Sequence, residues 1–123
     1  MESGIAEGVR LFNSEKFFEA HEALEAVWLT AQGDEKTFLH GLIQVAAAFH
    51  HHQKGNAKGC RSLLEKGSQK LERFGGTRAN IDVNGLLAQL VPWRAILRED
   101  ALLGAIEHPP LPRIKIAPPQ PSP

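Results

Sequence analysis

Residues 37–53, TFLHGLIQVAAAFHHHQ, decide the fold, because this stretch contains no Asp, Glu, Lys or Arg. On a helical wheel at about 100° per residue, its large and apolar side chains cover more than half of the circumference. These side chains are Phe38, Leu39, Leu42, Ile43, Val45, Ala46 and Phe49. A helix that is apolar nearly all round is buried in the middle of a protein. We therefore expect residues 35–53 to form the central helix.

Helical periodicity continues on both sides of this stretch, and no convincing strand pattern is present. Further helices are expected at residues 5–12, 15–31, 57–74, 83–90 and 92–107, the last beginning or kinking at Pro92. Helix caps are expected at Ser14, Asp34, Asn56 and Asp82, and helix stops at Gly33, Gly55 and Gly75. Short connections make consecutive helices antiparallel neighbours. The predicted fold is all-α, with about five to six helices in stacked antiparallel hairpins.

The C-terminus has a different composition, since seven of the eight prolines lie between residues 109 and 123. Proline cannot continue a helix and favours an extended chain. Ile114 and Ile116 alternate with Arg113 and Lys115, so we expect this tail to lie in a groove before it frays. Residues 1–108 are predicted to be a single helical domain, and residues 109–123 an extended proline-rich tail.

Charge and cysteine content narrow the function classes. Fourteen basic and fourteen acidic side chains cancel, so no global field attracts nucleic acid or a membrane, and neither partner is expected. Residues 54–78 carry seven bases against two acids, and Lys66, Lys70 and Arg73 cluster on one helical face. We interpret that face as solvated. The single Cys60 can form no internal disulfide, and no signal peptide or membrane-spanning stretch is visible, so a cytoplasmic location is expected.

Two polar side chains interrupt the apolar side of the helix expected at residues 15–31. Its apolar stripe consists of Phe17, Ala20, Leu24, Val27, Trp28 and Ala31, and is widened by Phe18 and Leu29. His21 and Glu25 fall inside this arc, one turn apart, and Glu22 lies at its edge. A carboxylate and an imidazole among aromatic rings need hydrogen-bond partners. We therefore expect His21 and Glu25 to be mostly buried and hydrogen-bonded, and Trp28 to be a core residue.

The central helix has one narrow polar stripe, which contains His40, Gln44 and His51. Consecutive residues point about 100° apart, so His51 alone among residues 50–52 joins this stripe. If the polar positions of the two helices face each other, they meet between the helices of a bundle. The predicted polar cluster consists of His21, Glu22, Glu25, His40, Gln44 and His51.

This cluster allows three interpretations: a buried network that fixes helix register, a ligand pocket, or a site for a divalent metal or acid–base chemistry. Neither HExxH nor a paired Glu-x-x-His motif is present. His40 and His51 are separated by about 16 Å along a helix, too far to share one metal. Antiparallel pairing places His21 nearer His51, so the predicted metal ligands are His21, Glu25 (or Glu22) and His51.

Residues 12–28, FNSEKFFEAHEALEAVW, resemble the motif FNxxxFFEAHExLExxW of the prokaryotic domain-of-unknown-function family 309. The resemblance continues through residues 38–44, FLHGLIQ, and through an HxxxGNxxG segment at residues 51–59. It covers residues 12–71 and includes every position of the predicted polar cluster. The resemblance implies a small all-helical protein and brings no known reaction.

The first functional hypothesis is a non-enzymatic binding module with a His/Glu-lined polar cavity. Such a module acts through an unknown protein partner or as a homodimer. The alternative is a hydrolase-like metal-dependent or acid–base enzyme that uses His21, Glu25 and His51, with Glu22 as base. A divalent metal is the one cofactor that this alternative implies.

Overall fold

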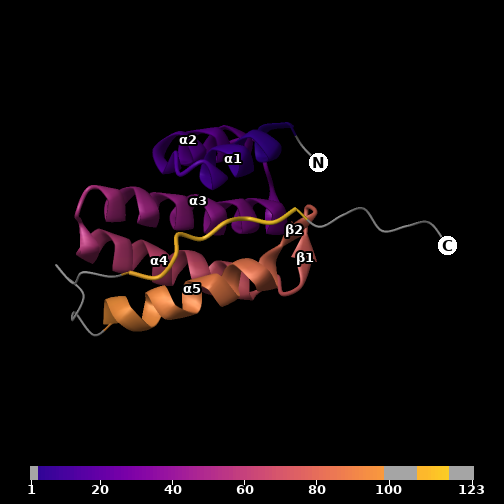
Figure 1. Ribbon diagram of the computed structural model, residues 1–123. Coiled ribbons are helices and arrows are strands. Elements are labelled where there is room, and N and C mark those ends of the chain that lie inside the picture. The colour runs from indigo at the N-terminus through magenta and orange to yellow at the C-terminus, as the bar shows by residue number, and fades with distance from the viewer. Residues whose placement is uncertain (1–2, 99–107, 117–123) are drawn as a thin grey trace.

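A computed structural model describes residues 3–98 and 108–116 of the chain. Its elements are α1 (Ser3–Asn13), α2 (Phe17–Trp28), α3 (Gly33–Gln53), α4 (Ala57–Glu72), β1 (Thr77–Arg78), β2 (Ile81–Asp82) and α5 (Val83–Arg98). Figure 1 shows α1 and α2 on one side of α3, and α4 and α5 on the other. The predicted all-α fold of antiparallel hairpins is confirmed. None of the helices in the described ranges is long and apolar enough to cross a membrane.

The central position of α3 follows from its sequence, because its apolar side chains are buried on several sides at once. The ring of Phe49 contacts Phe17 of α2 at a centroid distance of 5.6 Å and Trp93 of α5 at 5.0 Å. On the side of α4, a Cβ added to Gly67 would lie 2.9 Å from the carbonyl oxygen of Gly41. These two glycines therefore let α3 and α4 approach each other closely.

The turn between α1 and α2 differs from the prediction. Ser14 does not cap α2, which begins at Phe17 with Lys16 as its N-cap residue and no side-chain cap. Instead, Glu15 adopts a left-handed conformation with φ of 64°, and the backbone N–H groups of residues 14–16 donate to carbonyls of residues 10–12. These bonds close the end of α1 and leave Ser14 outside the next helix.

The boundary between α2 and α3 also differs. Gly33 was expected to end the second helix, but it begins α3 with φ of 60°, and the N-cap position belongs to Gln32. Asp34 lies inside the first turn of α3, so its predicted capping role is wrong. The caps at Asn56 and Asp82 are confirmed, since their carboxyl or amide oxygens accept from the backbone N–H groups of Gly59 and Gly85 at 2.9 Å.

A two-stranded antiparallel hairpin, β1 and β2, was not predicted. Arg78 pairs with Ile81, and the two residues between them, Ala79 and Asn80, have φ values of 51° and 63°. Two successive positive φ values make the tight turn that matches the twist of a hairpin. The segment lacks the Asn-Gly or Asp-Gly pair that marks such turns in a sequence, so no signal was visible.

No new helix begins at Pro92, because α5 runs from Val83 to Arg98 with Pro92 inside it. Val91 and Pro92 are exposed, while Leu90 and Trp93 are buried. Proline removes one helical hydrogen bond, and at this position the freed carbonyl of exposed Ala88 can bond to water. Buried neighbours on both sides hold the helix together. The rest of the predicted last helix, residues 99–107, lies outside the described residues.

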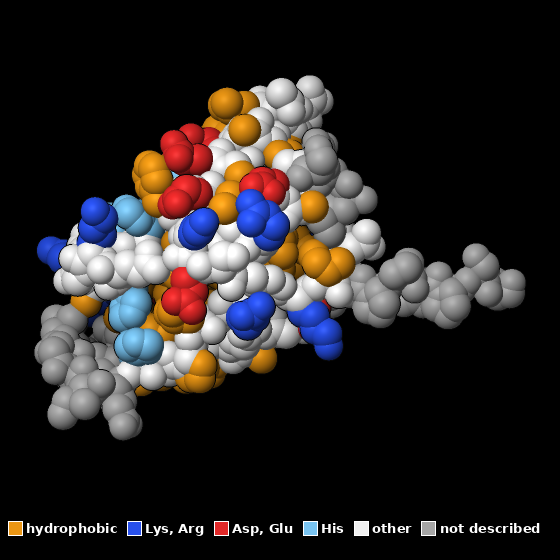
Figure 2. All heavy atoms as spheres, turned by 45° about the horizontal axis from the view of Figure 1, so that its top comes forward, with side chains coloured by type: hydrophobic (Ala, Val, Ile, Leu, Met, Phe, Trp, Pro, Cys, Tyr) orange, Lys and Arg blue, Asp and Glu red, His pale blue; other side chains and the backbone are white. Residues whose placement is uncertain are grey.

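The tail packs against the helices at Ile114, as expected, whereas Ile116 is 41% exposed. Ile114 is buried, and its backbone exchanges two hydrogen bonds with the side chain of Asn13 at 2.7 and 2.8 Å. The indole N–H of Trp93 donates to the Pro110 carbonyl at 2.9 Å. Figure 2 shows one face of the molecule, on which histidine side chains gather at the left. Figure 1 shows that α3 ends on this side. Residues 117–123 lie outside the described residues.

Candidate functional site

One strip along α3 is left partly exposed between α2 and α4. It consists of His40, Gln44, Ala47 and His51, spaced three or four residues apart. The side chains on either side of this strip pack against the neighbouring helices and are mostly buried. The polar stripe predicted on the central helix therefore coincides with its most accessible side.

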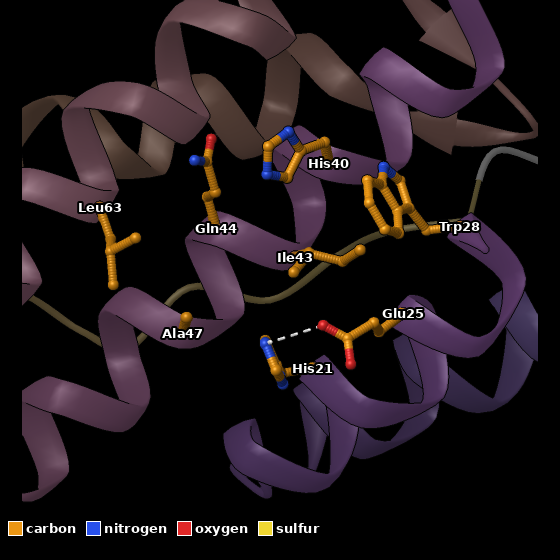
Figure 3. Close-up of a pocket in the computed structure, with 8 residues that line it drawn as sticks. All are labelled: His21, Glu25, Trp28, His40, Ile43, Gln44, Ala47 and Leu63. Atoms are coloured by element: carbon orange, nitrogen blue, oxygen red, sulfur yellow. Dashed lines mark ion pairs between the residues drawn. The ribbon is translucent and has the colours of Figure 1, made fainter. Parts of the chain in front are cut away.

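A hollow of about 210 Å³ opens beside this strip, between α2 and α3. Figure 3 shows side chains from α2 and α3 around it, with one residue contributed by α4. The lining residues are His21, Glu25, Trp28, His40, Ile43, Gln44, Ala47 and Leu63. Four members of the predicted polar cluster are thus brought together here.

His21 and Glu25 do not form the buried pair that was predicted. Nε2 of His21 lies 3.8 Å from the nearest Glu25 carboxylate oxygen, and the two side chains are 27% and 52% exposed. Glu25 therefore stands at the rim of the hollow, in contact with water. Nδ1 of His21 is buried and has no hydrogen-bond partner among the residues that the structure describes. The pair is a long, solvent-screened contact rather than a buried hydrogen bond.

The far end of the first hollow is aromatic and positively charged. The ring of His40 lies 5.7 Å from that of Trp28, and Nζ of Lys36 lies 4.4 Å from the Trp28 ring centre. Trp28 is only partly buried, so the prediction that it is a core residue is wrong. Burial and then the positive charge of Lys70 lower the pKa of His40. Nζ of Lys70 also donates to Oε1 of Gln44 at 2.9 Å.

A second hollow of about 320 Å³ continues the first toward the end of α3. It is lined by Phe18, His21, Ala47, His50 and His51, so that His21 and Ala47 belong to both hollows. The rings of Phe18 and His50 are 5.1 Å apart. The two hollows adjoin at the shared residues His21 and Ala47, and we call the two together the α2–α3 groove. Burial, followed by nearby charges, lowers the pKa of His50, so its ring is neutral at neutral pH.

His51 lies in the second hollow and is held there by the α3–α4 turn. The side-chain amide of Asn56 donates to Nδ1 of His51 at 3.0 Å, while the amide oxygen of Asn56 caps α4. Glu22 is exposed on α2 and lines neither hollow. In the described ranges no three His, Cys, Asp or Glu side chains lie close enough to hold a metal ion. His21, Glu25 and His51 therefore do not form such a group in the described ranges, and metal binding by them stays a prediction.

Several groove residues were not singled out from the sequence. Phe18 and Trp28 were assigned to the core, and nothing distinguished Ile43 or Leu63 from other buried positions. The groove is lined by apolar side chains and imidazoles, with a carboxylate at its rim. Outside the groove, burial raises the pKa of the Cys60 thiol to about 12, so this thiol stays protonated and is a poor nucleophile.

Comparison with known proteins yields a match to one family model. No curated protein matches the chain. The model of the domain of unknown function DUF309 matches residues 5–63. This range runs from α1 to the first half of α4 and includes every residue that lines the two hollows. Over these residues the chain is similar to the DUF309 family.

Proposed function

We propose that this protein is an interaction module, whose α2–α3 groove holds a helix from a protein partner. The observation that carries this proposal is the arrangement of two hollows in line along α3, joined at His21 and Ala47. A continuous apolar depression along a helix is the kind of surface that receives the apolar face of an amphipathic helix.

The spacing of the hollows supports a helical occupant. The α3 residues of the first hollow run from His40 to Ala47, and those of the second from Ala47 to His51. The midpoints of these spans are about 5.5 residues apart, which is roughly 8 Å at 1.5 Å per residue. Two side chains seven positions apart on a partner helix are separated by about 10.5 Å. Apolar residues at i and i+7 of the partner can therefore enter both hollows.

The chemistry of the groove supports apolar anchors. Phe18 is 46% exposed although it is a large hydrophobic side chain, and it stands beside the second hollow. Trp28 and Ile43 line the first hollow. Burying such surface against a partner is favourable, and the few imidazole and amide groups can fix the orientation of the bound helix.

Calorimetric titration with designed peptides tests the proposal. The probe is an alanine–glutamine helix with leucines at i and i+7. The control peptide carries the same leucines at i and i+5, which lie on different faces of a helix. We expect the first peptide to bind with a dissociation constant on the order of micromolar and the second at least about tenfold more weakly.

Two protein variants locate the binding. Ala47→Arg places a long charged side chain where the hollows join, and should abolish binding of the i, i+7 peptide. Ala26→Arg makes the same change at an exposed position of α2 that lines neither hollow, and should leave binding unchanged. Equal binding of the two peptides, or full binding by Ala47→Arg, would rule out a helix in this groove.

A further inference from the structure

We infer that the bound helix has one basic and one acidic edge, and that its basic edge faces α2 while its acidic edge faces α4. This inference rests on the proposed function and names the kind of partner that the groove selects. It follows from the charges that border the groove, which differ in sign on its two sides.

The border on α2 is acidic. Glu25 is half-exposed at the rim of the first hollow, and Figure 3 shows it on the α2 side of that hollow. Glu22 is exposed and three residues earlier, so the two carboxylates are neighbours on the surface of the helix. A helix lying in the groove would pass beside both carboxylates.

The border on α4 is basic. Lys70 reaches the groove, since its Nζ donates to Gln44 at 2.9 Å and its charge lowers the pKa of His40. Lys66 is exposed one turn earlier on the same helix. The close approach of α4 to α3 at Gly41 and Gly67 places Cβ of Lys70 beside Gly41.

The acidic and the basic border lie beside the same part of α3. Glu25 and Gln44 line the same hollow, and Gln44 accepts the hydrogen bond from Lys70. Glu25 and Lys70 are therefore on opposite sides of one point of the groove. A helix with its side chains is about 10–12 Å wide, so one flank would meet the acidic border while the other faces the basic border.

The remaining lysines near the groove lie at its ends. Nζ of Lys36 lies over Trp28 at the beginning of α3, and Lys54 follows the last residue of α3 near His50. Exposed ion pairs add little affinity, so the borders act mainly by rejecting helices with like charges on the wrong edge. Selectivity between charged peptides is therefore the property to measure.

The experiment compares four peptides that share leucines at i and i+7. Their edges carry only glutamine, only glutamate, only lysine, or lysine on one edge and glutamate on the other. A symmetric pair of leucines allows either helix direction, so the mixed peptide can always match both borders. The wild-type protein should bind the mixed peptide about fivefold more tightly than either single-charge peptide.

Charge reversal of the protein should then change the ranking. Glu22→Lys with Glu25→Lys makes both borders basic and should favour the all-glutamate peptide. Lys66→Glu with Lys70→Glu makes both borders acidic and should favour the all-lysine peptide. Glu7→Lys with Asp34→Lys changes the net charge as much as the first variant, at exposed positions that line neither hollow, and should leave the ranking unchanged. Circular dichroism melting confirms that each variant is folded.

The outcomes separate this inference from the proposed function. If the glutamine-edged peptide binds and the charged peptides show no ranking, the inference fails and the proposed function stands. If the glutamine-edged peptide does not bind, the proposed function fails. Light scattering could also show that the protein alone is a dimer and that Ala47→Arg dissociates it. In that case a second copy occupies the groove, and a separate partner helix with one basic and one acidic edge is excluded.

Discussion

The two neighbours of α3 pack against it in different ways. On the α4 side, Gly41 and Gly67 bring the two backbones together, and Leu71 lies fully buried against Gly41. On the α2 side, the facing residues include the rings of Phe18, His21 and Trp28, and the packing leaves two hollows. Small residues at one interface and large rings at the other thus give the same helix one closed side and one open side.

This difference explains where the candidate site lies. Close packing leaves no space for a ligand, because protein interiors are filled at nearly crystalline density. Beside the exposed strip of α3, the rings of Phe18, His21 and Trp28 line space that the packing of α2 leaves open. The open side is therefore also the side where substitutions should be tolerated best, and this can be tested.

The largest effect is expected from shortening one side chain at each interface. Leu71→Ala should lower the free energy of unfolding by about 3 kcal/mol, because the residue is fully buried and leaves a cavity. Trp28→Ala removes more atoms but should cost only about 1 kcal/mol, since Trp28 is partly exposed in a hollow. Urea denaturation measures both values. A Trp28 variant as unstable as the Leu71 variant would show that the α2 side is packed as tightly as the α4 side.

A smaller effect is expected at the glycine contact. Gly67→Ala raises helix propensity by up to about 1 kcal/mol, yet its Cβ would meet the Gly41 carbonyl at 2.9 Å, and backbone cannot move aside cheaply. We expect a net destabilisation of about 1–2 kcal/mol by urea denaturation. Ser62→Ala, at an exposed position of the same helix, should stay within about 0.5 kcal/mol of wild type. A stabilised Gly67 variant would mean that α3 and α4 have room between them.

The sequence predicted α3 and its surroundings well, because a long stretch without charges has only one stable location. The same wheel placed His40, Gln44 and His51 on one strip, and the strip is the accessible one. The pattern could not reveal the hairpin at Thr77–Asp82, whose turn residues carry no distinctive pair. The pattern also could not show that α5 continues past Pro92, because this depends on the burial of Leu90 and Trp93.

The candidate site was predicted less well, and the error began with Phe18 and Leu29. Counting both as core residues widened the apolar arc of α2 until it included Glu25, yet Phe18 and Leu29 are 46% and 67% exposed. Glu25 is therefore at a rim and not inside a core. The wheel also could not show that Asn56 holds His51 in a hollow of its own, because that contact depends on the geometry of the α3–α4 turn.

The groove side should also make stability depend on pH. Burial, together with the charge of Lys70 or Lys54, lowers the pKa of His40 and His50 below the value near 6.5 of an unfolded chain. The folded state then binds fewer protons than the unfolded state. The stabilisation is complete above about pH 6.5 and is lost as the pH falls through the lowered pKa values.

We therefore expect the urea midpoint to fall between pH 7.5 and pH 5.5, and to fall less in His40→Gln. His52, whose pKa is lowered by burial and by His108, contributes in the same direction and remains in that variant. The window stays above the range in which Glu65 is protonated, since Arg94 lowers the pKa of that carboxyl. A midpoint that rises on acidification would show that these rings gain a partner when charged, contrary to the contacts described.

The smallest effect is expected from metal ions, and it bears on the enzyme alternative. Nδ1 of His51 is occupied by Asn56, and Glu25 is half-exposed at a different hollow from His51. A metal bound by His21, Glu25 and His51 would have to draw these groups together against those contacts.

Zinc or manganese at a small excess over the protein, which is kept free of a polyhistidine tag, should leave the melting temperature unchanged. A site filled at 100 times its dissociation constant would instead stabilise the protein by about 2.7 kcal/mol, a shift of several degrees. Such a shift, lost in His51→Ala and kept in His40→Ala, would establish the predicted metal set and make the groove a catalytic candidate. A shift lost only in His52→Ala would instead reflect binding on the side of the histidine run that faces Trp93 and His108, where no groove residue takes part.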